Sequence, residues 1–575
     1  MGACIARIPD TAKDEEERII ARLVALRQQI GPKVEPVEET PPGTEDEDED
    51  ADTPGGGPRW RRWTDWVRGH RSAAALGLVV VLVVLVGGGY GIYRAAATCN
   101  GQTLVAGECS GLSDGSVPLL RDEPAQLAAL REQIHDENQK VLDSSQPWVS
   151  LAYVFPWAAS DDPEINDRLP VPALQHELEG ALVAQREANH TATFGKGPLV
   201  RVLLGNQGRA TSQYEAVDDA LSDLVGGDPN GAGNSEHIVA VVASGKSVAN
   251  ALKGIDAITG LGLPVLTTRM TSDEIAGNSG GRSVTRIAPN ISDGIAALAS
   301  FVHPLPYGAV LVQSSDGNDN YSRSLGDSFK TDFPGTISAS YPYDPRATTQ
   351  DMSTTIGNIC DNPTAQTAAD VTVFFAGRSS ELNAFIEALP GRLSCSKTHF
   401  TVVTASDAID TANAALSGPE SNSLNSGLRA NTDLYYAGIA SRQAWNPPYA
   451  AAGASPPLLA TDFPAQFPDA DLNDGAAIIG ADAVQTVVET VRFQPTSGAA
   501  AAPNDTPARV AQVLHERTGR YAISLASGPL SIGPTGKAVN KPVPIIRVVP
   551  PAITQPAGPA PIPGPSLVAL TSSGK

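Results

Sequence analysis

One serine has the local sequence of a catalytic nucleophile. Ser279 is the centre of GNSGG, a match to the GxSxG pattern in which a serine lies on a sharp turn between a strand and a helix. The sequence has neither the apolar strand before Ser279 nor the helix after it, so we interpret Ser279 as part of a loop. Walker A and HExxH patterns are absent, and no carboxylate pair stands out beside a histidine. An enzyme is therefore the less favoured class.

The composition limits the kinds of partner. The 575 residues include 41 Lys and Arg against 63 Asp and Glu, a formal net charge of −22, and 41% are hydrophobic. A chain of this length and hydrophobicity forms one large two-lobed unit or several small ones. Because the excess charge is negative, no basic face is indicated, and we expect no nucleic-acid partner.

One apolar segment predicts a membrane span at residues 72–94. Residues 72–93 carry no charge, and this length suffices for a helix to cross a hydrocarbon core of about 30 Å. Five arginines precede the segment and only Arg94 closely follows it, so the positive-inside rule places residues 1–71 in the cytoplasm. We expect a single-pass plasma-membrane protein with an extracellular C-terminal part. A buried globular helix is the less favoured alternative, because few such helices are apolar on every side.

The four external cysteines are expected to form two disulfides. Cys99 and Cys109 follow the span, and Cys360 and Cys395 come much later in the same oxidising compartment. We pair Cys99 with Cys109 and Cys360 with Cys395, and we expect Cys4 to be a free thiol. Because no CxxC occurs and the eight histidines are scattered, we expect neither a metal site nor a cofactor.

Flexible segments are expected on both sides of one folded unit, residues 146–549. Residues 1–71 combine a short helix candidate with an acidic run that we interpret as a solvated linker. Residues 95–145 are interpreted as an external linker with the Cys99–Cys109 loop. Residues 550–575 are interpreted as a Pro-rich disordered tail.

Within the folded unit, apolar strands alternate with amphipathic helices. Strands are expected at 148–155, 199–205, 237–243, 264–268, 309–313, 371–377 and 400–406. Helices are expected at 214–224, at 247–259 and around Leu174, Leu178 and Leu182. This alternation predicts parallel sheets covered on both faces. Ligands of such sheets bind beyond the C-terminal ends of the strands, so residues just after each strand are the candidates for function.

Three stretches together resemble a known family. Residues 241–277, 312–333 and 370–389 are similar, in order and spacing, to the type I periplasmic binding fold of the branched-chain amino acid receptor family. The resemblance covers about residues 146–549. It implies two doubly wound lobes joined by three crossovers that close on a small ligand like a hinged clamp. Lobe one would comprise about 146–290 and 408–515, and lobe two about 291–407 and 520–549.

The resemblance also implies ligand-binding residues between the lobes. Ser247 would offer its hydroxyl and backbone N–H to a ligand carboxylate, although a simple N-cap role fits equally well. Thr271 matches the family's second hydroxyl position, and Tyr321 matches the tyrosine of the lobe-two wall. Asp407 falls near the acidic residue that pairs with a ligand ammonium. Trp157 is a further candidate for the cleft, with packing in the core as the favoured alternative.

Arg378 departs from the family pattern, because amino-acid binders tend to have an aromatic residue at this position. A buried arginine needs an anionic partner, either the ligand or a protein carboxylate such as Glu381. Exposure at the lobe rim is the alternative. We therefore expect a polar or acidic amino-acid-like ligand in preference to leucine or valine.

The function implied by the resemblance is that of a membrane-anchored solute-binding protein. It would capture a small amino-acid-like ligand outside the cell for an ABC-type uptake system, with a membrane permease as a partner. A ligand-sensing or scaffold subunit, which keeps the fold without a transport role, is the alternative.

Overall fold

The computed structural model describes most of the predicted external part of the chain. The described residues are 98–99, 102–105, 108–120, 123–157, 171–226, 228–277, 283–302, 309–333, 336–362, 369–417, 421–450, 456–494, 505–552 and 564–572. The predicted cytoplasmic part, the predicted span at 72–94 and Ser279 lie outside them. None of the helices within these ranges is long and apolar enough to cross a membrane.

The first lobe is built on an eight-stranded sheet with the spatial order β1-β2-β3-β5-β4-β6-β7-β8. Its strands are β1 (Thr98–Cys99), β2 (Gln102–Val105), β3 (Glu108–Ser113), β4 (Trp148–Phe155), β5 (Leu199–Asn206), β6 (Ile238–Ala243), β7 (Val265–Thr267) and β8 (Val284–Arg286). The five strands from β5 to β8 in this order run parallel, and β3 pairs antiparallel with β5. The apolar runs that predicted β4, β5, β6 and β7 are confirmed, and they are buried over almost their whole length.

Helices cover both faces of this sheet. One face carries α4 (Ala125–Asp143), α5 (Val171–His190), α17 (Ala476–Val491) and α18 (Pro507–Glu516), and the other carries α6 (Tyr214–Leu224) and α7 (Ala249–Gly260). The alternation of side chains along β4 fills both cores. Leu151 and Tyr153 lie in the core with α5 and α17, whereas Ala152 and Val154 lie in the core with α6 and α7.

The second lobe has a seven-stranded sheet with the order β10-β9-β11-β12-β13-β16-β17. Its strands are β9 (Ala309–Ser314), β10 (Ile337–Tyr343), β11 (Asp370–Ala376), β12 (His399–Thr404), β13 (Thr432–Ala437), β16 (Pro542–Val549) and β17 (Gly564–Ser572). The first five strands in this order are parallel, and β16 and β17 are added antiparallel.

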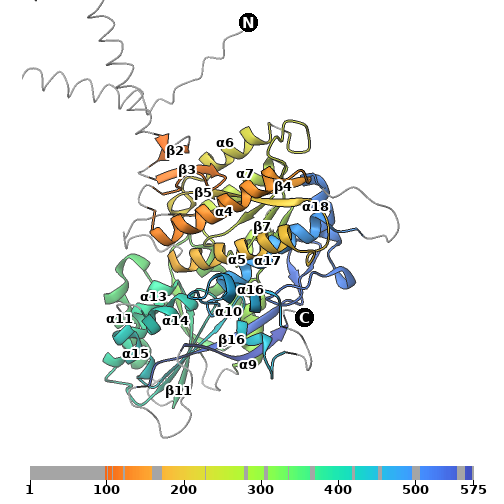
Figure 1. Cartoon of the computed structure of the whole chain (residues 1–575). Coiled ribbons are helices and arrows are strands. Elements are labelled where there is room, and N and C mark those ends of the chain that lie inside the picture. The colour runs from red at the N-terminus through yellow and green to blue at the C-terminus, as the bar shows by residue number, and fades with distance from the viewer. Residues whose placement is uncertain are drawn as a thin grey trace, which may run out of the picture. The chain divides into compact units, whose positions relative to one another are not determined.

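The helices of the second lobe also lie on both faces of its sheet. One group consists of α11 (Thr348–Asp361), α13 (Ser379–Ala388), α14 (Ala408–Ser417) and α15 (Ser421–Arg429). The other consists of α9 (Ile291–Phe301) and α10 (Asn320–Asp332). Figure 1 shows the two groups on opposite sides of β11. Both lobes are therefore sheets covered on both faces, as the alternation of strands and helices predicts.

Three crossovers connect the lobes. They are residues 287–290 between β8 and α9, residues 438–475 between β13 and α17, and residues 540–541 between β15 (Ala538–Val539) and β16. The expected return to lobe one at residue 408 is wrong. Residues 408–437 belong to the second lobe, because Leu424 and Leu428 of α15 and Leu434 of β13 are buried in its core.

Two segments interpreted as unstructured are part of the lobes. The expected linker at 95–145 contains β1, β2, β3 and α4, and Leu127, Leu130 and Ile134 of α4 are buried in the core of the first lobe. The expected tail at 550–575 contains β17, which pairs with β16 along its whole length. The segment LVAL within β17 supplies the hydrophobic residues that the Pro-rich stretch before it lacks.

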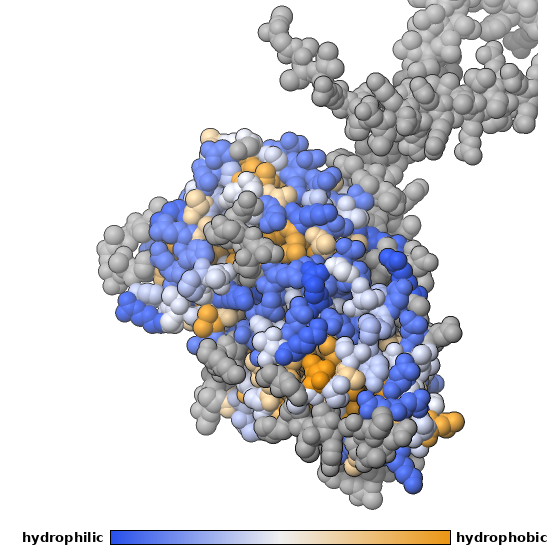
Figure 2. All heavy atoms as spheres, turned by 180° about the vertical axis from the view of Figure 1, so that it is seen from behind, coloured by the Kyte–Doolittle hydropathy of each residue, from blue (hydrophilic) through white to orange (hydrophobic). Residues whose placement is uncertain are grey.

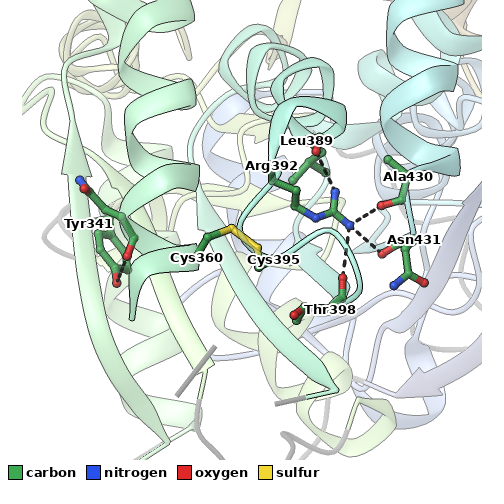
Figure 3. The surroundings of a disulfide bond; sticks show 9 residues. Tyr341, Cys360, Leu389, Arg392, Cys395, Thr398, Ala430 and Asn431 are labelled. Atoms are coloured by element: carbon green, nitrogen blue, oxygen red, sulfur yellow. Dashed lines mark hydrogen bonds between the residues drawn. A yellow bond between two sulfur atoms is a disulfide. The ribbon is translucent and has the colours of Figure 1, made fainter. Parts of the chain in front are cut away.

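The predicted disulfide between Cys360 and Cys395 is confirmed. Figure 3 shows it between the end of α11 and the loop before β12, beside the guanidinium of Arg392. The pairing of Cys99 with Cys109 stays a prediction, because the side chain of Cys99 is not among those that the structure describes. On the face seen in Figure 2, hydrophobic residues form small separate patches among hydrophilic ones.

Candidate functional site

Four of the predicted ligand-binding residues lie just beyond the C-terminal ends of parallel strands. Ser247 follows β6 of the first lobe, whereas Tyr321, Arg378 and Asp407 follow β9, β11 and β12 of the second. Contacts between these residues join the two lobes. This is the edge where ligands of open parallel sheets bind.

The guanidinium of Arg378 lies at the centre of these contacts. Its Nε and Nη2 donate to the two carboxylate oxygens of Asp319 at 3.0 and 2.5 Å, and its Nη1 donates to Oδ2 of Asp407 at 2.9 Å. Its Nη2 also donates to the carbonyl of Ser247 at 3.0 Å. The guanidinium carbon lies 4.5 Å from the centre of the Tyr321 ring, a cation–π contact. Arg378 is only 2% exposed, so the alternative of an arginine in solvent at the rim is excluded.

The anionic partners of Arg378 differ from the one suggested by the sequence. Asp319 and Asp407 bind the guanidinium, whereas the carboxylate of Glu381 accepts the backbone N–H of Arg378 at 2.5 Å and the Tyr343 hydroxyl at 2.8 Å. Arg378 is the N-cap of α13, and a carboxylate three residues later is well placed to accept its N–H. Burial raises the pKa of Glu381, and these two hydrogen bonds partly offset that effect.

Asp407 of the second lobe lies close to positive charges of both lobes. Besides Arg378, it lies 3.8 Å from Nζ of Lys246 in the first lobe, and its backbone N–H donates to the Tyr321 hydroxyl at 3.1 Å. Burial alone would raise the pKa of Asp407. The positive charges of Arg378 and Lys246 outweigh burial and hold the pKa below its usual range. Asp407 is therefore an anion that is already paired.

The hydroxyls expected to bind a ligand carboxylate have protein partners. The Ser247 hydroxyl accepts the backbone N–H of Ser272 at 3.1 Å, and Val248, not Ser247, is the N-cap of α7. Thr271 lies across the lobe boundary from Ser406, with 3.4 Å between the two hydroxyls. Ser247 and Thr271 are both buried.

Trp157 is a core residue of the first lobe. Its ring stacks on Phe155 with 4.3 Å between centroids, and its backbone N–H donates to the side chain of Asn206. Trp157 is absent from the linings of the cavities described below. The structure thus brings Ser247, Thr271, Tyr321, Arg378 and Asp407 to the lobe boundary and places Trp157 elsewhere.

The space between the lobes is divided unequally around Arg378. Two voids of about 10 Å³ each lie on the side next to the crossovers, which we call the inner side. One void is beside Thr271 and Ser406, and the other is beside Lys246 and Asp407. A cavity of about 400 Å³ lies on the outer side, and Arg378 is part of its wall. Its other lining residues include Val248, Ala249, Asn250 and Lys253 of the first lobe, and Asp316, Asp319, Arg346 and Glu381 of the second.

Several residues that line the cavity of about 400 Å³ were not predicted from the sequence. Asp319 lies in the cluster DGNDN, which is typical of a solvated loop, yet its carboxylate caps α10 by accepting the backbone N–H of Tyr321. Arg346 follows β10, an edge strand that has no continuous apolar run and alternates between half-buried and exposed residues. The signal in the sequence that could have identified both residues is their position, because each lies in the segment between a strand and the next α-helix.

A second cavity, of about 650 Å³, has a different character. It lies between α5, α17, the second crossover and residues 524–529, and its lining is mainly apolar, with Phe194, Trp445 and Leu459 among its residues. No predicted site residue belongs to it. Within the described ranges, no group of three His, Cys, Asp or Glu side chains is placed to hold a metal ion.

Comparisons with known proteins give similarity to solved structures alone. No protein-family model and no curated protein matches the sequence. A substrate-binding protein of an ABC transporter from Desulfitobacterium hafniense, in complex with Leu, matches with a TM-score of 0.49 and 15% identity over 70% of this chain and 97% of that chain. The branched-chain amino acid transporter substrate-binding protein of Streptococcus pneumoniae, in complex with isoleucine, matches with a TM-score of 0.48 and 13% identity over 74% and 99%.

A third match is a solute-binding protein of an ABC transporter from Rhodopseudomonas palustris, in complex with 3,4-dihydroxybenzoic acid, with a TM-score of 0.48, 13% identity and coverage of 74% and 98%. All three matches have TM-scores below 0.5 and identities of 13–15%. Because these ligands differ and the similarity is low, the matches assign no ligand to this chain.

Proposed function

We propose that this chain is an extracytoplasmic solute-binding protein that holds a small, polar, amino-acid-like ligand between its two lobes. The observation that supports this most is the cavity of about 400 Å³, whose walls come from both lobes where the parallel strands end. Cavities of this size are typical of small-molecule sites.

The residues that line the cavity suit a ligand that carries both a positive and a negative charge. Lys253 of the first lobe and Arg346 of the second are cations at its mouth, and α7 begins at its wall. A helix N-terminus and two cations favour a ligand carboxylate. Asp316 offers carboxylate oxygens for a ligand ammonium. An amino acid or a similar zwitterion fits this arrangement better than an apolar solute does.

The cellular setting follows from the sequence. The apolar segment at 72–94 and the arginines before it support a plasma-membrane anchor with the lobes outside the cell. A solute-binding protein held at the membrane in this way would deliver its ligand to a permease of an ABC-type uptake system.

Calorimetric titration of the full chain in detergent tests the proposal. The panel is aspartate, glutamate, asparagine, glutamine, leucine and valine, and we expect a polar member to bind more tightly than leucine. Arg346→Gln removes a cation from the cavity mouth and should weaken that binding about tenfold, or about 1.4 kcal/mol. Lys330→Gln is the matched control, because Lys330 is a surface cation of the same lobe that pairs with Asp327. Absence of binding by every solute, or equal losses in both variants, would refute the proposal.

A scaffold or signalling subunit is the second candidate. It is favoured by one observation, namely that Ser247, Arg378 and Asp407 already have protein partners and that the voids beside Thr271 and Lys246 are only about 10 Å³ each. A chain whose lobes are closed and which binds no solute in the panel would have this role.

A further inference from the structure

Arg378 has the contacts that a bound ligand would make. Its guanidinium is buried between the lobes, and it bonds the Ser247 carbonyl of the first lobe together with Asp319 and Asp407 of the second. The Tyr321 ring covers one face of the guanidinium. A small cation held by two carboxylates, a carbonyl and an aromatic ring is fully satisfied.

We propose that Arg378 acts as an internal ligand, which fills the polar site between the lobes and holds them closed when no solute is bound. The proposal deepens the proposed function, because it concerns the regulation of the same site. The contacts that carry it do not depend on any solute.

Arg378 is necessary for closure because Asp319 is buried and Asp407 is partly buried, with 15% of its side chain exposed. Asp319 and Asp407 both belong to the second lobe and both face the boundary. Without Arg378, the nearest cation to Asp407 among the ion pairs would be Lys246, 3.8 Å away. A buried and a partly buried carboxylate that lose their shared cation must regain water. Separation of the lobes admits that water, so the charge imbalance favours an open state.

The other contacts across the boundary include two ion pairs, Lys246–Asp407 at 3.8 Å and Arg269–Asp410 at 3.9 Å, and both are longer than a hydrogen bond. The remaining contacts include hydrogen bonds between neutral groups and one partly exposed ion pair. Ala249 donates its N–H to the Asn318 carbonyl at 3.2 Å, and Ser272 and Ser324 share a hydrogen bond of 2.7 Å. These are neutral bonds that water can replace at small cost. Arg323 donates two hydrogen bonds to the carboxylate of Glu274, at 2.8 and 2.6 Å, but the two side chains are 38% and 30% exposed, so water screens this pair more than it screens the pairs of Arg378.

Occupation of the inner site by Arg378 limits which solutes can bind there. The outer cavity is accessible while Arg378 stays in place, so a zwitterion can enter it without opening the lobes. A solute whose ammonium binds Asp319 or Asp407 must first displace the guanidinium. Arg378 therefore sets a threshold for solutes that reach the inner site.

A distance measurement without solute tests the proposal. Spin labels are attached at Glu132→Cys on α4 and Asp327→Cys on α10, whose native side chains are 71% and 67% exposed, in a full chain with Cys4 replaced by serine. Pulsed electron paramagnetic resonance should give one short distance for the unsubstituted site. Arg378→Ala should shift the distribution to longer distances, and added ethylguanidinium should restore the short distance by binding both aspartates.

The matched control is a second buried arginine of the same lobe. Arg392 donates to the carbonyls of Leu389, Thr398 and Asn431 (Figure 3). Its guanidinium lies over the ring of Phe400, and all of these partners belong to the second lobe. Arg392→Ala should lower the melting temperature without changing the distance. If Arg378→Ala does not fold, Arg378→Lys serves instead, because an ammonium lacks the planar fork that bridges Asp319 and Asp407.

An unchanged distance in the folded Arg378 variant would overturn the internal-ligand proposal, as would a shift that ethylguanidinium does not reverse. Because no solute is present, failure of the titration panel leaves this result intact. Conversely, solute binding by a chain whose lobes stay closed in Arg378→Ala would refute the internal ligand alone.

Discussion

A histidine of the first lobe fixes the end of the second crossover through an ionic hydrogen bond. Nδ1 of His176 on α5 lies 2.7 Å from Oδ2 of Asp474, whose other oxygen accepts the N–H of Ala476 at the start of α17. Burial alone would lower the pKa of His176. The hydrogen bond and charge of Asp474, with contributions from Glu179 and Asp471, raise the pKa above its usual 6.5.

We expect His176→Gln to lower stability in a pH-dependent way. Because the folded pKa is raised, the stabilisation is fully present below a pH of about 6.5 and is lost as the pH rises through the folded pKa. The variant should be less stable than the parent by about 1.5 kcal/mol at pH 6, and the difference should shrink at pH 9. Denaturant unfolding at both pH values measures this. A difference that is the same at both would show that the ion pair is not the cause.

The ion-pair partners of individual charged residues were the feature of the site that was hardest to predict from the sequence. The position of Arg378 after a strand, together with the family resemblance, suggested that it reaches the lobe boundary, but exposure at the rim remained an alternative. Its pairing with Asp319 depends on how the loop after β9 turns to cap α10, and nothing in DGNDN distinguishes that turn from a solvated one. Glu381 is nearer in sequence, but the geometry of an N-cap directs its carboxylate to the backbone of Arg378.

At the scale of elements, two glycines allow α5 and α17 to cross in close contact. A Cβ on Gly480 would lie 1.9 Å from the carbonyl oxygen of Glu177, and one on Gly180 would lie 1.9 Å from that of Ala477. Gly480→Ala would force the helices apart and should cost about 1–3 kcal/mol. Gly357→Ala on α11 is the control, since nothing lies within 4 Å of its Cβ, and it should stabilise the chain by about 0.5–1 kcal/mol. Thermal unfolding of both variants checks this, and a neutral Gly480→Ala would contradict the close contact.

The Cys360–Cys395 disulfide joins two other elements of the second lobe. It links the end of α11 to the loop before β12 across 35 residues of sequence. Replacement of both cysteines by alanine should lower stability by about 2–4 kcal/mol, because the unfolded chain gains entropy. Calorimetric melting of the parent with and without reductant gives an independent value. Equal melting temperatures for the parent and the double variant would mean that the disulfide contributes nothing.

Most elements of the parallel cores were predictable because their strands are continuous apolar runs. The strand β10 was missed, since one face of this edge strand is exposed and its sequence ISASYPY is half polar. The lobe border was misplaced at residue 408, because α14, α15 and β13 continue the same strand and helix rhythm without a break in composition. Only the contacts of Leu424 and Leu434 assign this segment to the second lobe.

At the scale of the whole molecule, the proposed topology makes a direct prediction for intact cells. A membrane-impermeant thiol reagent should label an engineered cysteine at Gln555 and fail to label one at Thr44, in a chain with Cys4 replaced by serine. The reason is the excess of arginines before the apolar segment. Permeabilised cells are the control, in which both positions should react. Labelling at Thr44 in intact cells would reverse the orientation.

The most direct test of solute capture between the lobes is a crystal structure of the chain grown with the tightest-binding solute of the panel. We expect electron density for the solute in the cavity lined by Val248 of the first lobe and by Asp316 and Arg346 of the second. Density in the apolar cavity beside Trp445, or none between the lobes, would contradict the proposed function.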